Sequence, residues 1–71
     1  MLIIFAGTMD EARRARRDRS EPEALIVTGF RALLGLDRND TLLRIGTWKD
    51  HPEAVDVNRI AREKAMDVID G

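Results

Sequence analysis

Three apolar runs in this chain each end at a glycine–threonine pair, and a segment of helical character follows each run. The runs are residues 2–6, 25–27 and 42–45, and the pairs that end them are Gly7-Thr8, Thr28-Gly29 and Gly46-Thr47. Strand, turn and helix in threefold succession are typical of a small parallel α/β sheet. Ligands of such sheets bind beyond the carboxyl ends of the strands, where these pairs should lie.

The first run is apolar throughout, which predicts a central strand covered on both faces. The third predicted strand, from Thr41 to Thr47 or Trp48, alternates between apolar and polar positions, which favours an edge strand. Right-handed crossovers then favour the strand order 2-1-3, with 3-2-1 as the alternative. We therefore predict a three-stranded parallel sheet in a βαβαβα arrangement within one domain, residues 1–71, a Rossmann-like half without a phosphate-binding motif.

The predicted first helix runs from Met9 to about Arg19. It begins at the capping-box pattern of Thr8 and Glu11, in which each side chain accepts a hydrogen bond from the other residue's amide. The second predicted helix is a short one, residues 30–36, with Phe30, Leu33 and Leu34 facing the sheet.

The predicted last helix has Asp50 as its N-cap and Pro52 in its first turn. Its inner stripe of apolar residues extends almost to Gly71, which should follow the end of the helix. The stripe consists of Val57, Ile60, Ala61, Ala65, Val68 and Ile69.

Coverage of the predicted sheet is incomplete. In the order 2-1-3 the short middle helix lies on one face and the first and last helices lie on the other. A chain of 71 residues is also a small one, and such a chain buries only about 60% of its unfolded surface. Both arguments predict self-association into a homo-oligomer.

Composition excludes several kinds of site. The chain has no cysteine and a single histidine, His51, so we expect neither disulfides nor a thiolate or histidine-cluster metal site. The formal net charge of −1 predicts no global attraction to nucleic acid or to an anionic membrane. No apolar run approaches the roughly 20 residues of a membrane span, and the apolar start lacks a basic signal-peptide region, which favours an intracellular protein.

No cofactor or catalytic residue is predicted. The Gly7-Thr8 turn lacks both the dinucleotide-binding and the P-loop fingerprints, and Asp10 and Glu11 already place negative charge on the first helical turn. Asp50 and His51 resemble a base with its orienting carboxylate, but no nucleophile motif accompanies them.

The arginine-rich stretch of residues 13–19 is the sharpest charge feature. Helical spacing places Arg13, Arg14 and Arg17 on the outward face, where they could grip a nucleic-acid backbone. The favoured interpretation is a solvated or protein-contacting face, because Asp10 and Asp18 stand at ion-pair spacings from these arginines. No aromatic residue interleaves the arginines, so a stacking platform for single strands is not predicted.

Two aromatic residues form a candidate protein interface. Trp48 follows the third predicted strand, tryptophan is enriched at interface hot spots, and Phe30 comes from the same end of the sheet. The alternative for Trp48 is packing over the last helix.

The segments RALLGL (residues 31–36) and LLRIGTW (residues 42–48), separated by a short polar turn and followed by His51-Pro52, resemble a pattern in small proteins from actinobacterial phage genomes. The resemblance implies a phage-encoded accessory protein in the cytoplasm of a bacterial host and implies no activity. A weaker likeness is to half of a helicase-type α/β core, whose nucleotide-binding lysine and acidic strand end this chain lacks.

These observations predict a non-enzymatic accessory protein that self-associates and binds a protein partner, for instance one of a bacterial host. Nucleic-acid binding through the first helix is the alternative. Catalysis by a rim of Thr8, Thr28 and Thr47 is the least supported hypothesis.

Overall fold

The computed structural model describes all 71 residues. It contains four strands, two α-helices and two short 3₁₀ turns, so it has one strand more than the sequence pattern predicted. In chain order the elements are β1 (Leu2–Ala6), α1 (Met9–Asp18), β2 (Leu25–Val27), η1 (Phe30–Leu33), β3 (Thr41–Ile45), η2 (Trp48–Asp50), α2 (Ala54–Glu63) and β4 (Asp67–Asp70).

The four strands form one parallel sheet in the order β2-β1-β3-β4. The predicted order of the first three strands, with β1 between β2 and β3, is confirmed. The prediction that β3 is an edge strand was wrong, because β4 pairs with its outer side from Thr41↔Asp67 to Arg44↔Asp70. The polar position that suggested an edge, Arg44, instead reaches across to β4.

The fourth strand replaces what was predicted as the second half of the last helix. The helix α2 ends at Glu63, and Ala65 takes a left-handed conformation with φ of 56°. Its amide and that of Met66 donate back to the carbonyls of Arg62 and Ala61, which closes the helix in the manner of a C-terminal cap without glycine. The predicted stripe therefore divides, with Val57, Ile60 and Ala61 buried in α2 and Val68 and Ile69 exposed on β4.

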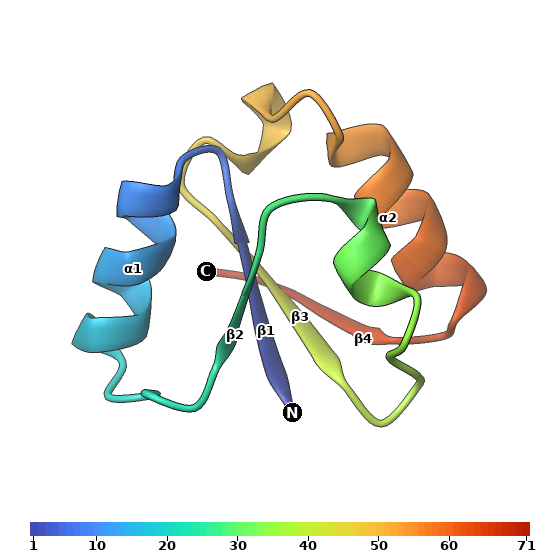
Figure 1. Ribbon diagram of the computed structural model, residues 1–71, viewed down its shortest axis with the longest axis horizontal. Helices are drawn as coiled ribbons and strands as arrows, with labels where there is room; N and C mark the ends of the chain where they lie inside the picture. The colour runs from blue at the N-terminus through green and yellow to red at the C-terminus, as the bar shows by residue number, and fades with distance from the viewer.

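Helices cover both faces of the sheet (Figure 1). Helix α1 packs on one face, and η1 lies together with α2 on the other. The prediction that the first and last helices share a face was wrong. The connection from β3 to β4 runs in the same direction across the sheet as the one from β2 to β3, so right-handed crossovers put η1 and α2 on the same side.

The core is accordingly divided between the two faces. Phe5, Leu42 and Val57 belong to the cluster on the α2 side, whereas Ile4 and Ala12 belong to the cluster on the α1 side. Alternate residues of β1 feed the two clusters, and four of its five residues are buried, as expected of a central strand. The exposed residues of the sheet lie on its edge strands, Leu25 on β2 and all four residues of β4, and neither face is left bare.

The predicted helix starts are confirmed only in part. The capping box of Thr8 and Glu11 is confirmed, with Glu11 N donating to Thr8 Oγ1 at 3.2 Å. The predicted second helix is only the 3₁₀ turn η1, in which Leu33 is buried but Leu34 is 58% exposed. Asp50 is not a helix cap, since it lies in η2 and α2 begins after Glu53.

Candidate functional site

The carboxyl ends of β1 and β3 flank the crevice where parallel sheets usually bind their ligands. The chain leaves β1 for α1 on one face, and it leaves β3 for η2 and α2 on the other, so these neighbouring strands form the topological switch point. The Gly7-Thr8 and Gly46-Thr47 pairs lie there, as predicted. The chemistry of the crevice is therefore set by what occupies the space between the two pairs.

The carboxylate of Glu11 occupies that crevice. It accepts hydrogen bonds from the hydroxyl of Thr47 at 2.7 Å and from its amide at 3.1 Å. It also accepts from the amide of Thr8 at 3.2 Å and from its hydroxyl at 3.3 Å. This negative charge lies beside the start of α1, where a phosphate would otherwise be favoured, so the protein's own side chain takes the place of an anionic ligand.

Two glycines allow this closure. A Cβ atom on Gly46, whose φ is 56°, would collide with the Glu11 carboxylate, and a Cβ atom on Gly7 would collide with Thr47. The glycines therefore permit the loops after β1 and β3 to meet, which is a structural reason for their presence that requires no ligand.

The hydrogen bonds to Glu11 make its contribution to stability depend on pH. Chiefly the Thr47 hydroxyl, and then the Thr47 amide, lower the pKa of Glu11 below its ordinary value of 4.5. The folded state thus favours the carboxylate, and its stabilising effect is complete above the ordinary pKa and is lost as the pH falls through the lowered one.

We expect the urea midpoint of the wild-type protein to fall more steeply between about pH 5 and pH 3 than that of Glu11→Gln. Thr47→Val removes only the hydroxyl donor and should give an intermediate slope. Part of the acid dependence should survive in both variants, because the pKa values of Asp40 and Asp70 are also lowered, by the Asp37 amide and by Arg44 respectively. Identical slopes in wild type and Glu11→Gln would contradict the described role of the carboxylate.

The threonine rim and His51 do not form a catalytic arrangement. Thr8, Thr28 and His51 line a cavity of about 50 Å³, whereas ligand pockets usually measure about 300 to 1,000 Å³. The Nδ1 atom of His51 accepts a hydrogen bond from the Glu53 amide at 3.0 Å. Its ring packs against Phe5 with 5.0 Å between centroids, so the imidazole serves the start of α2 and the core.

The arginines predicted to contact nucleic acid lie on the surface of α1. Arg13, Arg14 and Arg17 are all exposed, and the one ion pair on the helix is a 3.9 Å contact between Arg17 and its neighbour Asp18. The ion pairs that the spacing of Asp10 and Asp18 suggested for Arg13 and Arg14 do not form.

A hollow in this surface was not evident from the sequence. Arg13 and Arg17 line it together with the half-buried Arg16, at the point where α1 meets the turn of Ser20 and Pro22. The hollow is open, measures about 430 Å³ and has no acidic residue in its lining. Arg14 lies outside this lining. The three arginines that could hold one anion together are therefore Arg13, Arg16 and Arg17, with Arg16 in place of the predicted Arg14.

The two aromatic residues of the candidate protein interface are less exposed than expected. Phe30 and Trp48 are both half-buried and pack against the core cluster on the α2 side. Phe30 also borders an open hollow of about 420 Å³ at the end of β2, next to Arg31 and Glu53. Trp48 lies against the guanidinium group of Arg44, whose central carbon is 4.2 Å from the ring centroid.

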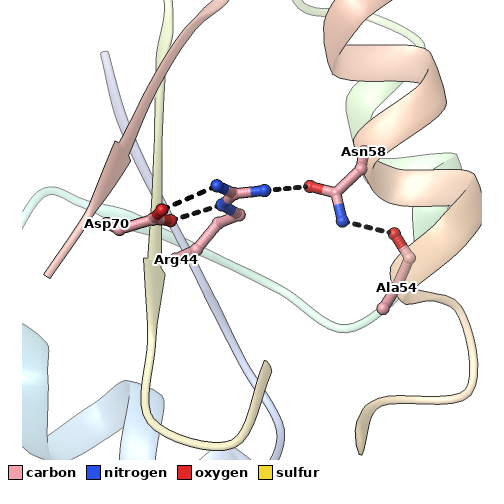
Figure 2. A network of polar contacts seen from close by, with 4 residues as sticks. All are labelled: Arg44, Ala54, Asn58 and Asp70. Carbon is pink, nitrogen blue, oxygen red and sulfur yellow. Dashed lines mark hydrogen bonds and ion pairs between the residues drawn. The ribbon is translucent and has the colours of Figure 1, made fainter. Parts of the chain in front are cut away.

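Arg44 belongs to a polar network that ties β3 to β4 and α2 (Figure 2). Its guanidinium donates to both carboxylate oxygens of Asp70, at 2.5 and 2.8 Å, and to the side-chain oxygen of Asn58 at 3.1 Å. Asn58 in turn donates to the carbonyl of Ala54 at 2.8 Å. Arg44 therefore acts as a structural clamp on the last strand.

Comparisons with protein-family models, with curated protein sequences and with solved structures found no match to this chain. The structure contains no group of three or more potential metal-ligating side chains. Neither helix is long and apolar enough to cross a membrane.

Proposed function

We propose that this chain is a non-catalytic binding module that holds the phosphate backbone of a nucleic acid with the arginines of α1. The observation that carries the proposal is the open hollow of about 430 Å³ lined by Arg13, Arg16 and Arg17 without an acidic residue. Apart from the long 3.9 Å contact of Arg17 with Asp18, no carboxylate pairs with these guanidinium groups, which leaves them suited to bidentate contacts with phosphate oxygens.

The distribution of charge supports the same proposal. Residues 13–19 hold five arginines and one aspartate, whereas the rest of the chain holds seven basic and twelve acidic residues. The net charge of −1 thus combines one cationic stretch, residues 13–19, with an acidic remainder of the chain. Such segregation orients a protein toward a polyanion and keeps its other surfaces away from it.

The type of nucleic acid follows from what accompanies the arginines. No aromatic side chain lies among them or lines the hollow, so bases have no platform on which to stack. Contacts to phosphates alone give binding without sequence preference. We therefore propose the backbone of a duplex as the partner. The resemblance to small actinobacterial phage proteins makes the cytoplasm of a bacterial host the proposed place of action.

Binding of a protein partner is the second candidate function, and the hollow beside Phe30 favours it. That hollow joins an aromatic ring to Arg31 and Glu53 at the end of β2. It is less favoured than the arginine surface, because both Phe30 and Trp48 are half-buried in the protein's own core and so have less surface to offer as anchors.

We expect a fluorescently labelled DNA duplex to bind at low salt, as measured by anisotropy. Three phosphate contacts should weaken the affinity about 40-fold between 50 and 200 mM salt. The triple variant Arg13→Ala/Arg16→Ala/Arg17→Ala should lose binding by more than about tenfold and should show a shallower salt dependence.

The matched control is Arg31→Ala/Arg38→Ala/Arg62→Ala, which removes the same charge from exposed positions elsewhere. It should bind nearly as well as the wild type. Equal loss in both triple variants would show that net charge alone matters, and absence of binding to DNA and RNA duplexes at low salt would refute the proposal. Tighter binding to single strands than to duplexes would refute the choice of partner.

A further inference from the structure

The strand β4 leaves one edge of the sheet unpaired. All four of its residues are exposed, with Val68 at 42% and Ile69 at 51%. The amide of Gly71 donates to the carbonyl of Arg44 at 2.9 Å. Because backbone groups alternate in direction along a strand, those of Val68 and Asp70 point away from β3. The edge therefore presents two residues with free N–H and C=O groups beside two exposed apolar side chains.

Charges that usually protect such an edge are weakened here. Acidic or basic residues on an edge strand repel a second strand, and β4 begins and ends with Asp67 and Asp70. The carboxylate of Asp70, however, is held by both the Nε and the second terminal nitrogen of Arg44 (Figure 2). Asn58 holds the same guanidinium from α2, so one of the two charges is neutralised in a fixed position.

We propose that two copies of the chain pair through their β4 strands, antiparallel about a twofold axis, with Ile69 opposite Ile69 of the second copy. In this register Val68 of each copy lies opposite Asp70 of the other, and the two pairs exchange four backbone hydrogen bonds through the groups that point outward. Asp67 then lies opposite Gly71, so no like charges face each other.

The charges of the strand and the sheet face of each side chain both disfavour a shift of one residue from this register. A shift of one residue that places Val68 opposite Ile69 would set Asp67 directly against Asp70 of the second copy, which is unfavourable for like charges. The same shift would also bring side chains from opposite faces of the sheet together. With Ile69 at the axis, its exposed side chain meets an identical apolar side chain on the α1 face, next to Leu43 of β3.

The resulting dimer has an eight-stranded sheet, since each copy contributes four strands. A twofold axis perpendicular to the sheet keeps both α1 helices on the same face. The two arginine surfaces then point to the same side of the assembly. The pairing itself needs no nucleic acid, so it stands or falls independently of the proposed function.

A single four-residue strand buries less than the roughly 1,200 Å² of stable complexes, so we expect a weak dimer with a dissociation constant of about 0.1 mM. Sedimentation equilibrium of the wild type between 10 µM and 1 mM should show this association. A protein that remains strictly monomeric at 1 mM would overturn the proposal, and so would assembly beyond the dimer, because a twofold contact closes on itself.

Disulfide trapping tests the register. The chain has no cysteine, so Ile69→Cys introduces its only thiol at a non-hydrogen-bonded pair, where opposite Cα atoms lie close enough for a disulfide. At 100 µM under mild oxidation we expect a covalent dimer to form at least tenfold faster than for Leu25→Cys. Leu25 is a matched control, since it is 40% exposed on the opposite edge strand β2.

Circular dichroism of both variants before oxidation establishes that each is folded. Equal rates of cross-linking in the two folded variants would overturn the proposal, because they would reflect random collision. Should Ile69→Cys fail to fold, Ile69→Lys and Leu25→Lys replace the pair, and only the first should abolish association in the ultracentrifuge. Association unchanged in Ile69→Lys would equally overturn the proposed pairing.

Discussion

Replacing Phe5 with alanine is expected to remove most of the protein's free energy of unfolding at 25 °C. Phe5 is completely buried near the carboxyl end of β1, where it joins the core cluster on the α2 side and packs against the ring of His51. Removing a buried phenylalanine ring costs about 3–5 kcal/mol. A 71-residue domain lies near the lower end of the usual stability of about 5–15 kcal/mol. Urea unfolding followed by circular dichroism measures the effect.

The control for Phe5→Ala is Val55→Ala, at a side chain on α2 that is 80% exposed. Its free energy of unfolding should change by less than about 0.5 kcal/mol. A loss below about 1 kcal/mol in Phe5→Ala would mean that the ring is not enclosed as described, since even partial collapse around the cavity leaves a larger cost.

The second large effect is expected for Gly7→Ala. The added methyl group would overlap the hydroxyl of Thr47 and its backbone carbonyl group. The hydroxyl could rotate, but the carbonyl could move only with the whole loop after β3, which Glu11 holds in place. We expect a loss of about 3 kcal/mol in the free energy of unfolding, at the upper end for overpacking by one methyl group.

Gly35→Ala provides the comparison, because nothing lies within 4 Å of a Cβ atom at that glycine. There the substitution should be neutral or should stabilise by about 0.4–1 kcal/mol, as it restricts the unfolded chain. If Gly7→Ala proved as harmless as Gly35→Ala, the loops after β1 and β3 would not meet in solution, and the crevice would be open to a ligand.

The parts of the fold that follow from short-range chemistry were predicted from the sequence. The run of residues 2–6 has no polar position, so it predicted a strand buried on both faces, and the strand order around it then followed from the handedness of crossovers. The capping box of Thr8 and Glu11 likewise depends on residues three apart. The capping box had a single consistent structure, whereas the strand order had 3-2-1 as an alternative to the observed one.

The last strand was missed because two patterns overlap. Ala61, Ala65 and Val68 stand at helical spacing, so the sequence pattern predicted that the apolar stripe of the last helix continues through them. What ends the helix is the left-handed conformation of Ala65, a geometry that usually calls for glycine or asparagine. The β-branched pair Val68-Ile69 between two aspartates was the available signal for a short strand. Missing it also led to the wrong face for the last helix and the wrong position for β3.

The candidate site was predicted only at the level of residue types. The exposed arginines of α1 follow from helical spacing, but the hollow depends on where the turn of Ser20 and Pro22 packs. The contact of Glu11 with Thr47 joins residues 36 positions apart, and Glu11 was already explained by its role at the helix start. Because the capping box explains Glu11 completely, nothing in the sequence indicates its additional long-range contact with Thr47.

The clamp on β4 also gives the molecule an optical reporter. Trp48 is the only tryptophan in the chain, and the guanidinium that stacks on its indole ring is the same one that grips Asp70. Detachment of β4 would release that guanidinium and alter the surroundings of the sole strong fluorophore. Emission intensity therefore responds to loss of this edge as well as to loss of the core cluster on which Trp48 packs. Detachment of β4 ahead of global denaturation would separate the fluorescence transition from the far-ultraviolet one.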